Sequence, residues 1–233
     1  AGLALGFATG RMRAAVAPLW RQTRLGGPHI VHNGAEVRAE GRTIASWPLT
    51  PAQATTVQRL CAEHGWYAEL YVGEGYFVTD ARPEAAVHWG MLHRDPEGLV
   101  ADLPGEAEVL KATVALFGDD PAPVVERLER EGLAAGTATS PMAPEVVFIN
   151  VTDPRVDKGR ALRRASEHLG VGLDEVVAIG DGLNDLSMLA LAGTAIAMGQ
   201  APQAVREAAH LVVPEVADDG VAHALELVTS LRE

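Results

Sequence analysis

Two patterns of apolar and polar positions divide the chain. From about residue 146 onwards, short apolar runs at 176–179, 194–198 and 211–213 alternate with stretches in which apolar residues recur at helical spacing. Buried strands that alternate with helices form parallel sheets covered by helices on both faces. This part of the chain is therefore expected to be an α/β domain with a Rossmann-like parallel sheet.

Helices are expected around these strands. Asp157 has a side chain that can cap a helix start, and Gly170 can end a helix in the left-handed conformation. The helix between them presents apolar residues on one face, as a helix packed on a sheet does. The four predicted helices cover residues 157–169, 184–192, 202–209 and 219–231.

The first 35 residues contain the same kinds of element. The apolar run 3–8 ends at Thr9-Gly10-Arg11, which predicts a buried strand that leads into a loop. Residues 12–25 have helical spacing, although Pro18 disturbs the first half. A second short strand is expected at 29–31, closed by the turn pair Asn33-Gly34.

The pattern differs between about residue 35 and about residue 144. Short strand-like stretches punctuated by Gly and Pro are mixed with two amphipathic helices, which is typical of an α+β arrangement. The predicted strands are 36–39, 42–47, 67–72, 76–78 and 109–117, and the predicted helices are 49–64 and 121–132. We therefore expect a core domain formed by residues 1–35 and 146–233, interrupted by an inserted domain at 36–145.

Composition limits the partners. The chain of 233 residues is 48% hydrophobic and 21% charged, as in ordinary soluble proteins, and its net charge of -12 argues against binding nucleic acid or an anionic membrane surface. No apolar run reaches the ~20 residues that span a bilayer. The single cysteine, Cys61, requires no oxidising compartment, so a cytoplasmic location is expected.

The strongest chemical signal is the sequence Gly-Asp-Gly-Leu-Asn-Asp at 180–185, between an apolar strand and a helix. Ligands of open α/β sheets bind at the carboxyl ends of strands. Asp181 and Asp185 place two carboxylates in one turn there, and hard oxygen ligands suit Mg²⁺. The alternative is a structural Gly-Asp turn in which Asp185 only favours the helix dipole.

Two weaker signals accompany it. Lys158 opens a helix, where a cation opposes the helix dipole unless an anion offsets it, so it either meets a nearby phosphate or carboxylate or is a solvated lysine. Thr9 ends the first strand, where its hydroxyl and the following backbone N–H groups can form an anion nest, although such turns are also common without a ligand.

Taken in order, these signals resemble the haloacid dehalogenase (HAD) superfamily of phosphatases. That family has a Thr or Ser ending a strand, a Lys at a helix start and an acidic Gly-Asp-x-x-x-Asp loop, matched here by Thr9, Lys158, Asp181 and Asp185. Ala-Thr-Gly-Arg at 8–11, Asn-Gly-Ala at 33–35 and Ala-Met-Gly at 197–199 look like the Cof-type branch, whose type IIB cap domain occupies the position of the inserted segment.

The resemblance implies a Mg²⁺-dependent phosphohydrolase that acts on a small phosphorylated metabolite such as a sugar phosphate. Asp181 and Asp185 would hold the metal, and Thr9 and Lys158 the phosphoryl oxygens. Asn184 would orient the loop. Gly10, Arg11 and Asn33 would belong to the phosphate- or substrate-binding set. The cap aromatics at 66, 67, 71 and 76 are interpreted as core, with a sugar pocket as the alternative.

One family motif is absent from the 233 residues. An Asp-x-Asp at the end of the first strand supplies the nucleophile and the general acid/base, and no such sequence precedes Thr9. Asp119-Asp120 has neither the spacing nor the position. We expect about 30 residues upstream that contain this strand.

Two other function classes stay open at the level of the sequence. One is a catalytically inactive, HAD-like protein that binds phosphate in a regulatory role. The other is the phosphorylation domain of a P-type ATPase, whose acidic loop is similar. The lack of membrane spans and of an Asp-Lys-Thr-Gly sequence argues against the ATPase.

Overall fold

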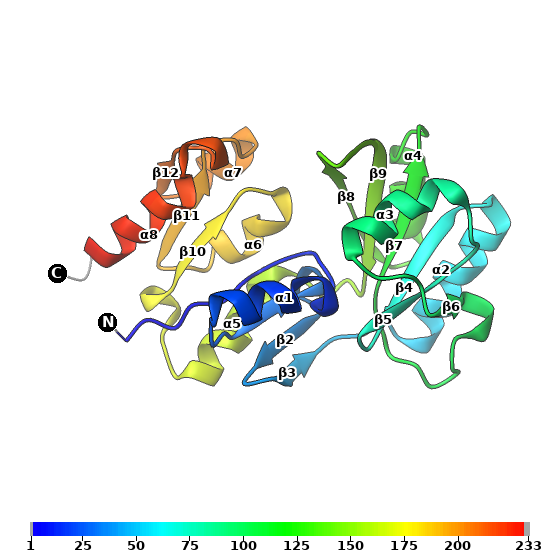
Figure 1. Cartoon of the computed structure of the whole chain (residues 1–233), viewed down its shortest axis with the longest axis horizontal. Helices are drawn as coiled ribbons and strands as arrows, with labels where there is room; N and C mark the ends of the chain where they lie inside the picture. Colours follow the sequence, from blue (N-terminus) through cyan, green and yellow to red (C-terminus); the bar gives the residue numbers. More distant parts are fainter. Residues whose placement is uncertain (1, 231–233) are drawn as a thin grey trace. The chain divides into compact units, whose positions relative to one another are not determined.

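The computed structural model describes residues 2–230, which form two compact units. The first unit extends to Val156 and the second begins at Asp157 (Figure 1). None of the helices within residues 2–230 combines the length and the apolar character needed to cross a membrane. Leu231, the predicted end of the last helix, lies outside the described residues.

The second unit is built on a parallel sheet of three strands, as the sequence predicts. The strands lie in the order β10 (Val177–Gly180), β11 (Thr194–Met198) and β12 (Leu211–Val213). β10 is displaced by one residue from the prediction, because its ladder ends where Gly180 pairs with Ala197. The carboxyl end of β10 therefore leads directly into the acidic loop.

The helices of the second unit are α5 (Lys158–Leu169), α6 (Leu186–Leu189), α7 (Gln203–Glu207) and α8 (Gly220–Ser230). The predicted caps of α5 are confirmed: the Asp157 side chain accepts a hydrogen bond from the Arg160 N–H at 2.8 Å, and Gly170 ends the helix at a φ of 68°. The single helix predicted at 184–192 is wrong, because a 3₁₀ turn at Leu183–Asp185 precedes a short α6.

One edge of β10 has no partner within the described residues. β10 pairs with β11 alone, so it is an edge strand of the three-stranded sheet. An edge strand presents a row of backbone N–H and C=O groups to which a further strand can add. The second unit therefore presents an unpaired strand edge next to the acidic loop.

The first unit contains a six-stranded sheet in the order β6-β5-β4-β7-β9-β8. Its strands are β4 (Tyr67–Val72), β5 (Gly75–Val78), β6 (Gly98–Leu99), β7 (Val109–Phe117), β8 (Ala134–Ser140) and β9 (Ala143–Thr152). The helices α2 (Pro51–His64) and α4 (Ala122–Arg130) pack on one face, and α3 (Ala86–Leu92) packs on the other. Figure 1 shows α3 and α2 on opposite sides of β4 and β7.

Several of these elements match the predictions and others do not. The strands 67–72 and 109–117 are confirmed. α3, β8 and β9 were not predicted. β8 is composed of Ala, Gly, Ser and Thr and has no apolar alternation to detect. Tyr67, Tyr71 and Tyr76 are at most 1% exposed, which confirms their interpretation as core.

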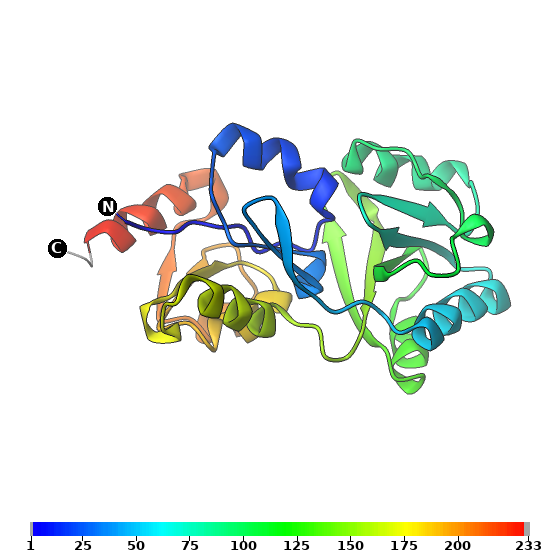
Figure 2. The same ribbon diagram turned by 90° about the horizontal axis from the view of Figure 1, so that it is seen from below.

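A smaller antiparallel sheet joins β1 (His29–Val31), β2 (Glu36–Ala39) and β3 (Arg42–Ser46). The helix α1 (Arg13–Thr23), which includes Pro18, lies beside this sheet (Figure 2). β2 and β3 thus pair with β1 and not with the six-stranded sheet. The domain boundaries at residues 35 and 145 stay a prediction.

The strand predicted at 3–8 is present only as an extended segment. Ala8 forms an isolated parallel bridge with Ile30, supported by hydrogen bonds from the Ile30 N–H to the Phe7 carbonyl and from the Thr9 N–H to the Ile30 carbonyl. The bridge is isolated, so no continuous ladder forms. Thr9 still lies at the end of this extended segment.

Candidate active site

In the first unit, the turn at Thr9-Gly10-Arg11 is closed by its own polar groups. The Arg11 N–H donates to Thr9 Oγ1 at 3.1 Å, and the Asn33 N–H donates to the Thr9 carbonyl at 3.1 Å. The prediction assigned the backbone N–H groups after Thr9 to an anion. In the structure the Arg11 N–H instead donates to the Thr9 hydroxyl. The Arg11 side chain is exposed.

Gly10 is required because Asn33 packs directly against it. A Cβ at position 10 would lie 2.5 Å from Asn33 Oδ1, closer than any ordinary contact. Asn33 holds this position with a φ of 59°, in the left-handed region, next to His32 at 52°. Asn tolerates this conformation better than most side chains. The structure thus brings Asn33 against the Thr9-Gly10-Arg11 turn.

Lys111, which the sequence analysis missed, also reaches this turn. Its Nζ donates to the Gly10 carbonyl at 3.0 Å and to Asn150 Oδ1 at 2.9 Å, and it lies 4.7 Å from the centre of the Tyr71 ring. The residue is 4% exposed. Burial lowers the pKa of Lys111 from 10.5 to about 8, and the nearby Glu69 carboxylate offsets only part of this effect.

The buried ammonium predicts a pH-dependent stability. Below about pH 8, Lys111 is charged in both the folded and unfolded states, and the full cost of burying the charge reduces the free energy of unfolding. Between about 8 and 10.5 the unfolded state binds more protons, so the free energy of unfolding rises with pH. Relative to Lys111→Met, the wild type should gain up to about 3 kcal/mol across this range.

Urea unfolding of both proteins at several pH values between about 7 and about 10.5 measures this difference. Groups that titrate in both proteins cancel in the comparison. A difference that stays constant with pH would mean that Lys111 keeps an ordinary pKa.

In the second unit, Lys158 and Asp185 form a buried ion pair. Lys158 Nζ lies 2.5 Å from Asp185 Oδ1, and each residue is 4% exposed. The other oxygen, Asp185 Oδ2, accepts the N–H groups of Asp181 at 2.9 Å and Gly182 at 3.0 Å. These contacts exclude a solvated Lys158, and they explain the 3₁₀ turn, since Asp185 bonds back to its own loop.

Two glycines allow this pair to form. A Cβ at Gly180 would lie 2.6 Å from the Asp185 Cβ, and one at Gly159 would lie 2.4 Å from the Ser187 carbonyl oxygen. The Gly159 N–H also donates to Ser187 Oγ at 3.0 Å. α5 and the acidic loop therefore approach each other closely, which carries Lys158 to Asp185.

Asp181 is the exposed carboxylate of the loop. Its Oδ2 accepts from Gln200 Nε2 at 3.3 Å, and Asn184 lies nearby in the sequence and is also exposed. Within residues 2–230 no group of three or more His, Cys, Asp or Glu side chains is placed to bind a metal. Mg²⁺ commonly takes only one or two protein carboxylates, with water and substrate phosphate completing its shell. An accessible Asp181 fits that requirement, whereas both Asp185 oxygens already have partners.

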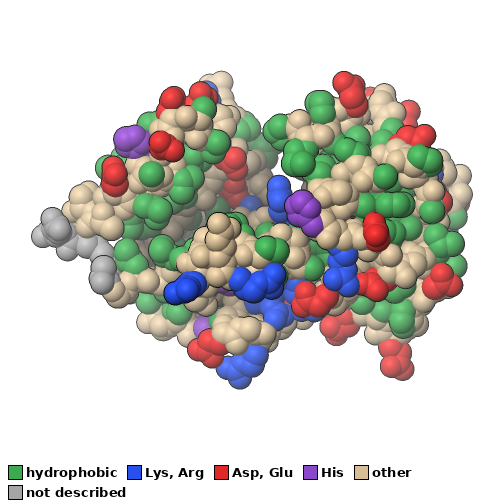
Figure 3. All heavy atoms as spheres, viewed as in Figure 1, with side chains coloured by type: hydrophobic (Ala, Val, Ile, Leu, Met, Phe, Trp, Pro, Cys, Tyr) green, Lys and Arg blue, Asp and Glu red, His purple; other side chains and the backbone are tan. Residues whose placement is uncertain are grey.

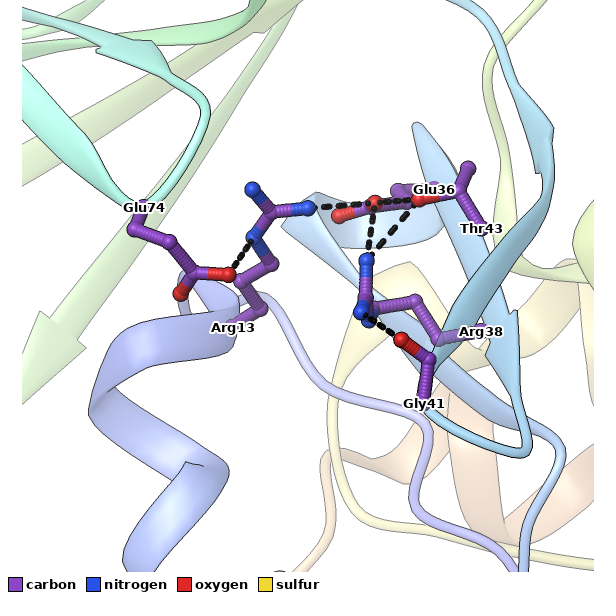
Figure 4. A network of polar contacts seen from close by, with 6 residues as sticks. All are labelled: Arg13, Glu36, Arg38, Gly41, Thr43 and Glu74. Carbon is purple, nitrogen blue, oxygen red and sulfur yellow. Dashed lines mark hydrogen bonds and ion pairs between the residues drawn. The ribbon is translucent and has the colours of Figure 1, made fainter.

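One cavity of the first unit is not formed by the motif residues. About 480 Å³ in volume, it lies between α1 and the β2–β3 hairpin, and Arg13, Arg21 and Arg38 contribute to its wall. Figure 3 shows basic side chains over this region. Glu36 accepts from Arg13 at 3.0 Å and from Arg38 at 3.2 Å (Figure 4). Because the guanidinium groups of Arg13 and Arg38 already have carboxylate partners, the cavity is not evidence for an anion site.

The predicted site residues thus fall into two sets. Thr9, Gly10 and Asn33 are in contact in the first unit, with Arg11 in the same turn. Lys158, Asp181, Asn184 and Asp185 are gathered at the carboxyl end of β10 in the second. Sequence reasoning missed Lys111 and Gln200. Lys111 could have been noticed, because a lysine is unusual inside an apolar strand such as 109–117.

Comparisons with known proteins identify the family of the chain. The model of the haloacid dehalogenase-like hydrolase family matches residues 1–225. A phosphoglycolate phosphatase of Halorubrum lacusprofundi is 34% identical over 176 residues, which cover 66% of this chain and 76% of the relative. An HMP-PP phosphatase of Cronobacter sakazakii is 29% identical over 234 residues, which cover 96% and 82%.

Solved structures show the same fold. A sugar phosphatase of HAD subclass IIB superposes with a TM-score of 0.78 at 24% identity, over 97% of this chain and 85% of its own. A haloacid dehalogenase-like hydrolase from B. subtilis gives a TM-score of 0.81 at 22% identity, over 97% and 87%. The predicted fold class, an α/β Rossmann-like core with an inserted α+β cap, is confirmed.

Proposed function

Since the chain belongs to the haloacid dehalogenase-like hydrolases and is a phosphatase, we propose that it cleaves a small phosphate monoester through an aspartyl-phosphate, with Mg²⁺ as cofactor. The substrate is a small phosphorylated metabolite of the sugar-phosphate kind. The observation that carries the proposal is the buried Lys158–Asp185 pair at the end of β10, with the exposed Asp181 beside it.

Lys158 provides a cation in a place where water is largely excluded. The ammonium has three N–H donors, and Asp185 Oδ1 takes one of them at 2.5 Å. Asp185 fixes the direction of Lys158 and, through its other oxygen, the backbone of the loop. The role proposed for Lys158 is to bind the phosphoryl oxygens and stabilise the charge that develops on them, an effect that is strong in a preorganised site.

Asp181 is the residue proposed to hold Mg²⁺ directly, and Asp185 supports the same loop from behind. When bound, Mg²⁺ reduces the repulsion between an anionic nucleophile and the phosphate. Gln200 orients the Asp181 carboxylate through its Nε2. In the first unit, the proposed role of Thr9 is to donate its hydroxyl hydrogen to a phosphoryl oxygen while the hydroxyl oxygen still accepts the Arg11 N–H.

The nucleophile is proposed to lie outside these 233 residues. They contain no Asp-x-Asp, and β10 has an edge to which a strand can add. In the proposed reaction an aspartate carboxylate attacks phosphorus and the ester oxygen leaves with a proton from the second aspartate. That aspartate then takes a proton from the water that hydrolyses the aspartyl-phosphate.

Asp181→Asn tests the proposed metal site. The variant keeps the size of the side chain and removes the charge of the metal ligand, so we expect a large rise in the Mg²⁺ concentration needed for half-maximal turnover. At saturating Mg²⁺ a residual rate should remain below that of the wild type. The measurement is hydrolysis of an aryl phosphate by the full-length protein against free Mg²⁺.

Gln200→Leu is the matched control, because it removes the neighbour of Asp181 and leaves the carboxylate in place. Its Mg²⁺ requirement should change by much less. An unchanged Mg²⁺ requirement in Asp181→Asn would show that Asp181 is not the metal ligand.

A further inference from the structure

Lysine is rare in this chain and both copies are buried. Of the 19 Lys and Arg residues only Lys111 and Lys158 are lysines, and each is 4% exposed. Arginine stays charged at every accessible pH, whereas a buried lysine has a tunable charge. Lys158 is already proposed to meet the phosphate. Lys111, in the other unit, has no part in the proposed mechanism.

Burial of the charged Lys111 side chain lowers the free energy of unfolding. It lies within β7, between apolar neighbours that are themselves buried. Both of its hydrogen bonds go to neutral oxygens, those of Gly10 and the Asn150 side chain. A buried ammonium without a carboxylate in contact is strongly unfavourable, and groups of this kind are candidates for a functional role.

Lys111 holds the middle of the Thr9-Gly10-Arg11 turn. Its Nζ binds the Gly10 carbonyl at 3.0 Å across 101 residues of sequence, and Asn33 packs against the Cα of Gly10. The helix that follows the turn is fixed as well, because Arg13 forms ion pairs with Glu36 and with Glu74 (Figure 4). Contacts from distant parts of the first unit thus determine the shape of the turn.

His32 and Glu69 are titratable neighbours of Lys111. His32 is fully buried and neither ring nitrogen has a hydrogen-bond partner among the described residues. Burial lowers the pKa of His32 well below its usual value, and the charges of Lys111 and Arg13 lower it further. The nearby acid Glu69 is already bound by the Tyr67 and Tyr71 hydroxyls.

We propose that Lys111 is a positioning residue for phosphate binding: it fixes the Thr9-Gly10-Arg11 turn through the Gly10 carbonyl and supplies a buried positive charge to a phosphate bound there. The proposal rests on the proposed function, because it requires Thr9 to bind phosphate. Lys111 acts through Gly10 and through its charge, and it takes no part in proton transfer or attack.

The proposal links phosphate binding to the protonation of Lys111. Burial lowers its pKa to about 8 in the absence of a ligand. A bound phosphate dianion favours the charged form, so the pKa should rise by about one unit. The other charged or titratable groups around Lys111 are Glu69 and Tyr71 on β4, His32 after β1 and Arg13 on α1.

The experiment is NMR of the full-length protein labelled with ¹³C at lysine Cε. The 233 residues contribute only two lysine signals, which the variants Lys111→Met and Lys158→Met assign. The Lys111 signal is followed against pH without inorganic phosphate and with phosphate at concentrations that inhibit turnover. We expect its midpoint to move upward by about one unit, with a concurrent change in the Lys158 signal.

The NMR signal of Lys158 distinguishes the proposed role of Lys111 from the proposed function in the same spectra. If phosphate changes the Lys158 signal and leaves the Lys111 midpoint unmoved, the role of Lys111 is refuted while the proposed function stands. If neither signal responds, both are refuted.

A kinetic comparison gives an independent readout. Lys111→Met should raise KM for an aryl phosphate by more than tenfold at about pH 7, with a smaller change in kcat, because the turn that binds the ground-state phosphate is no longer held. Thr113→Val is the matched control, since it removes a buried hydroxyl from the same face of β7 and no charge. Equal KM values for the two variants would overturn the proposal.

Discussion

Lys158→Met is expected to lower kcat/KM by about three orders of magnitude, because it removes a preorganised cation from the charge that develops on the phosphoryl oxygens. The structure adds a second effect. Asp185 is 4% exposed and Lys158 is the cation that contacts it. Loss of Lys158 leaves the buried Asp185 carboxylate without its cation, which costs about 3–5 kcal/mol of stability. Activity and melting temperature should therefore fall together.

A double variant separates the two effects. Lys158→Met combined with Asp185→Asn leaves neither charge unpaired, so it should regain much of the melting temperature. Its kcat/KM should stay as low as that of the single variant, since the cation is still missing. Assays are made on the full-length protein below the melting temperature of each variant. If activity returned with stability, Lys158 would serve only to neutralise Asp185.

Candidate site residues could be named from the sequence, whereas their contacts could not. The order of Thr9, Lys158, Asp181 and Asp185 and their positions next to apolar runs pointed to a phosphate site. The sequence left open whether Lys158 was solvated. That question depends on a contact across 27 residues, made possible by the close approach at Gly159 and Gly180.

Local patterns also explain which elements were predicted well. Strand β7 is rich in apolar residues and was predicted at its observed bounds. The run 184–192 has helical spacing, but the Asp185 side chain bonds to backbone N–H groups of its own loop and a 3₁₀ turn forms first. Side-chain competition of this kind is not visible in apolar periodicity.

The role of Lys111 could not be identified from sequence motifs. It belongs to none of the phosphatase motifs found along the sequence, and its partners Gly10 and Asn150 lie 101 and 39 residues away. A charged residue within an apolar strand was the available signal, since lysine is rarely buried without a reason. The identity of its partner, the phosphate-motif turn, emerged only from the fold.

The proposed aspartate outside the 233 residues leads to the largest expected effect. Thr9, Lys158, Asp181 and Asp185 are proposed to bind a phosphate and a cation, but none of them is proposed as the nucleophile. Phosphate monoesters hydrolyse extremely slowly without catalysis, so binding alone gives almost no turnover. Adding a nucleophile and an acid/base group should therefore raise the rate by many orders of magnitude.

The most direct measurement compares hydrolysis of an aryl phosphate, with Mg²⁺, by the 233-residue chain and by a chain extended upstream to include an Asp-x-Asp strand. We predict turnover at ordinary enzymatic rates by the extended chain and none above background by the shorter one. An Asp181→Asn form of each chain controls for contaminating phosphatase. Turnover by the 233-residue chain that its Asp181→Asn form lacks would contradict the account, as would an upstream sequence without Asp-x-Asp, which would favour an inactive phosphate-binding protein.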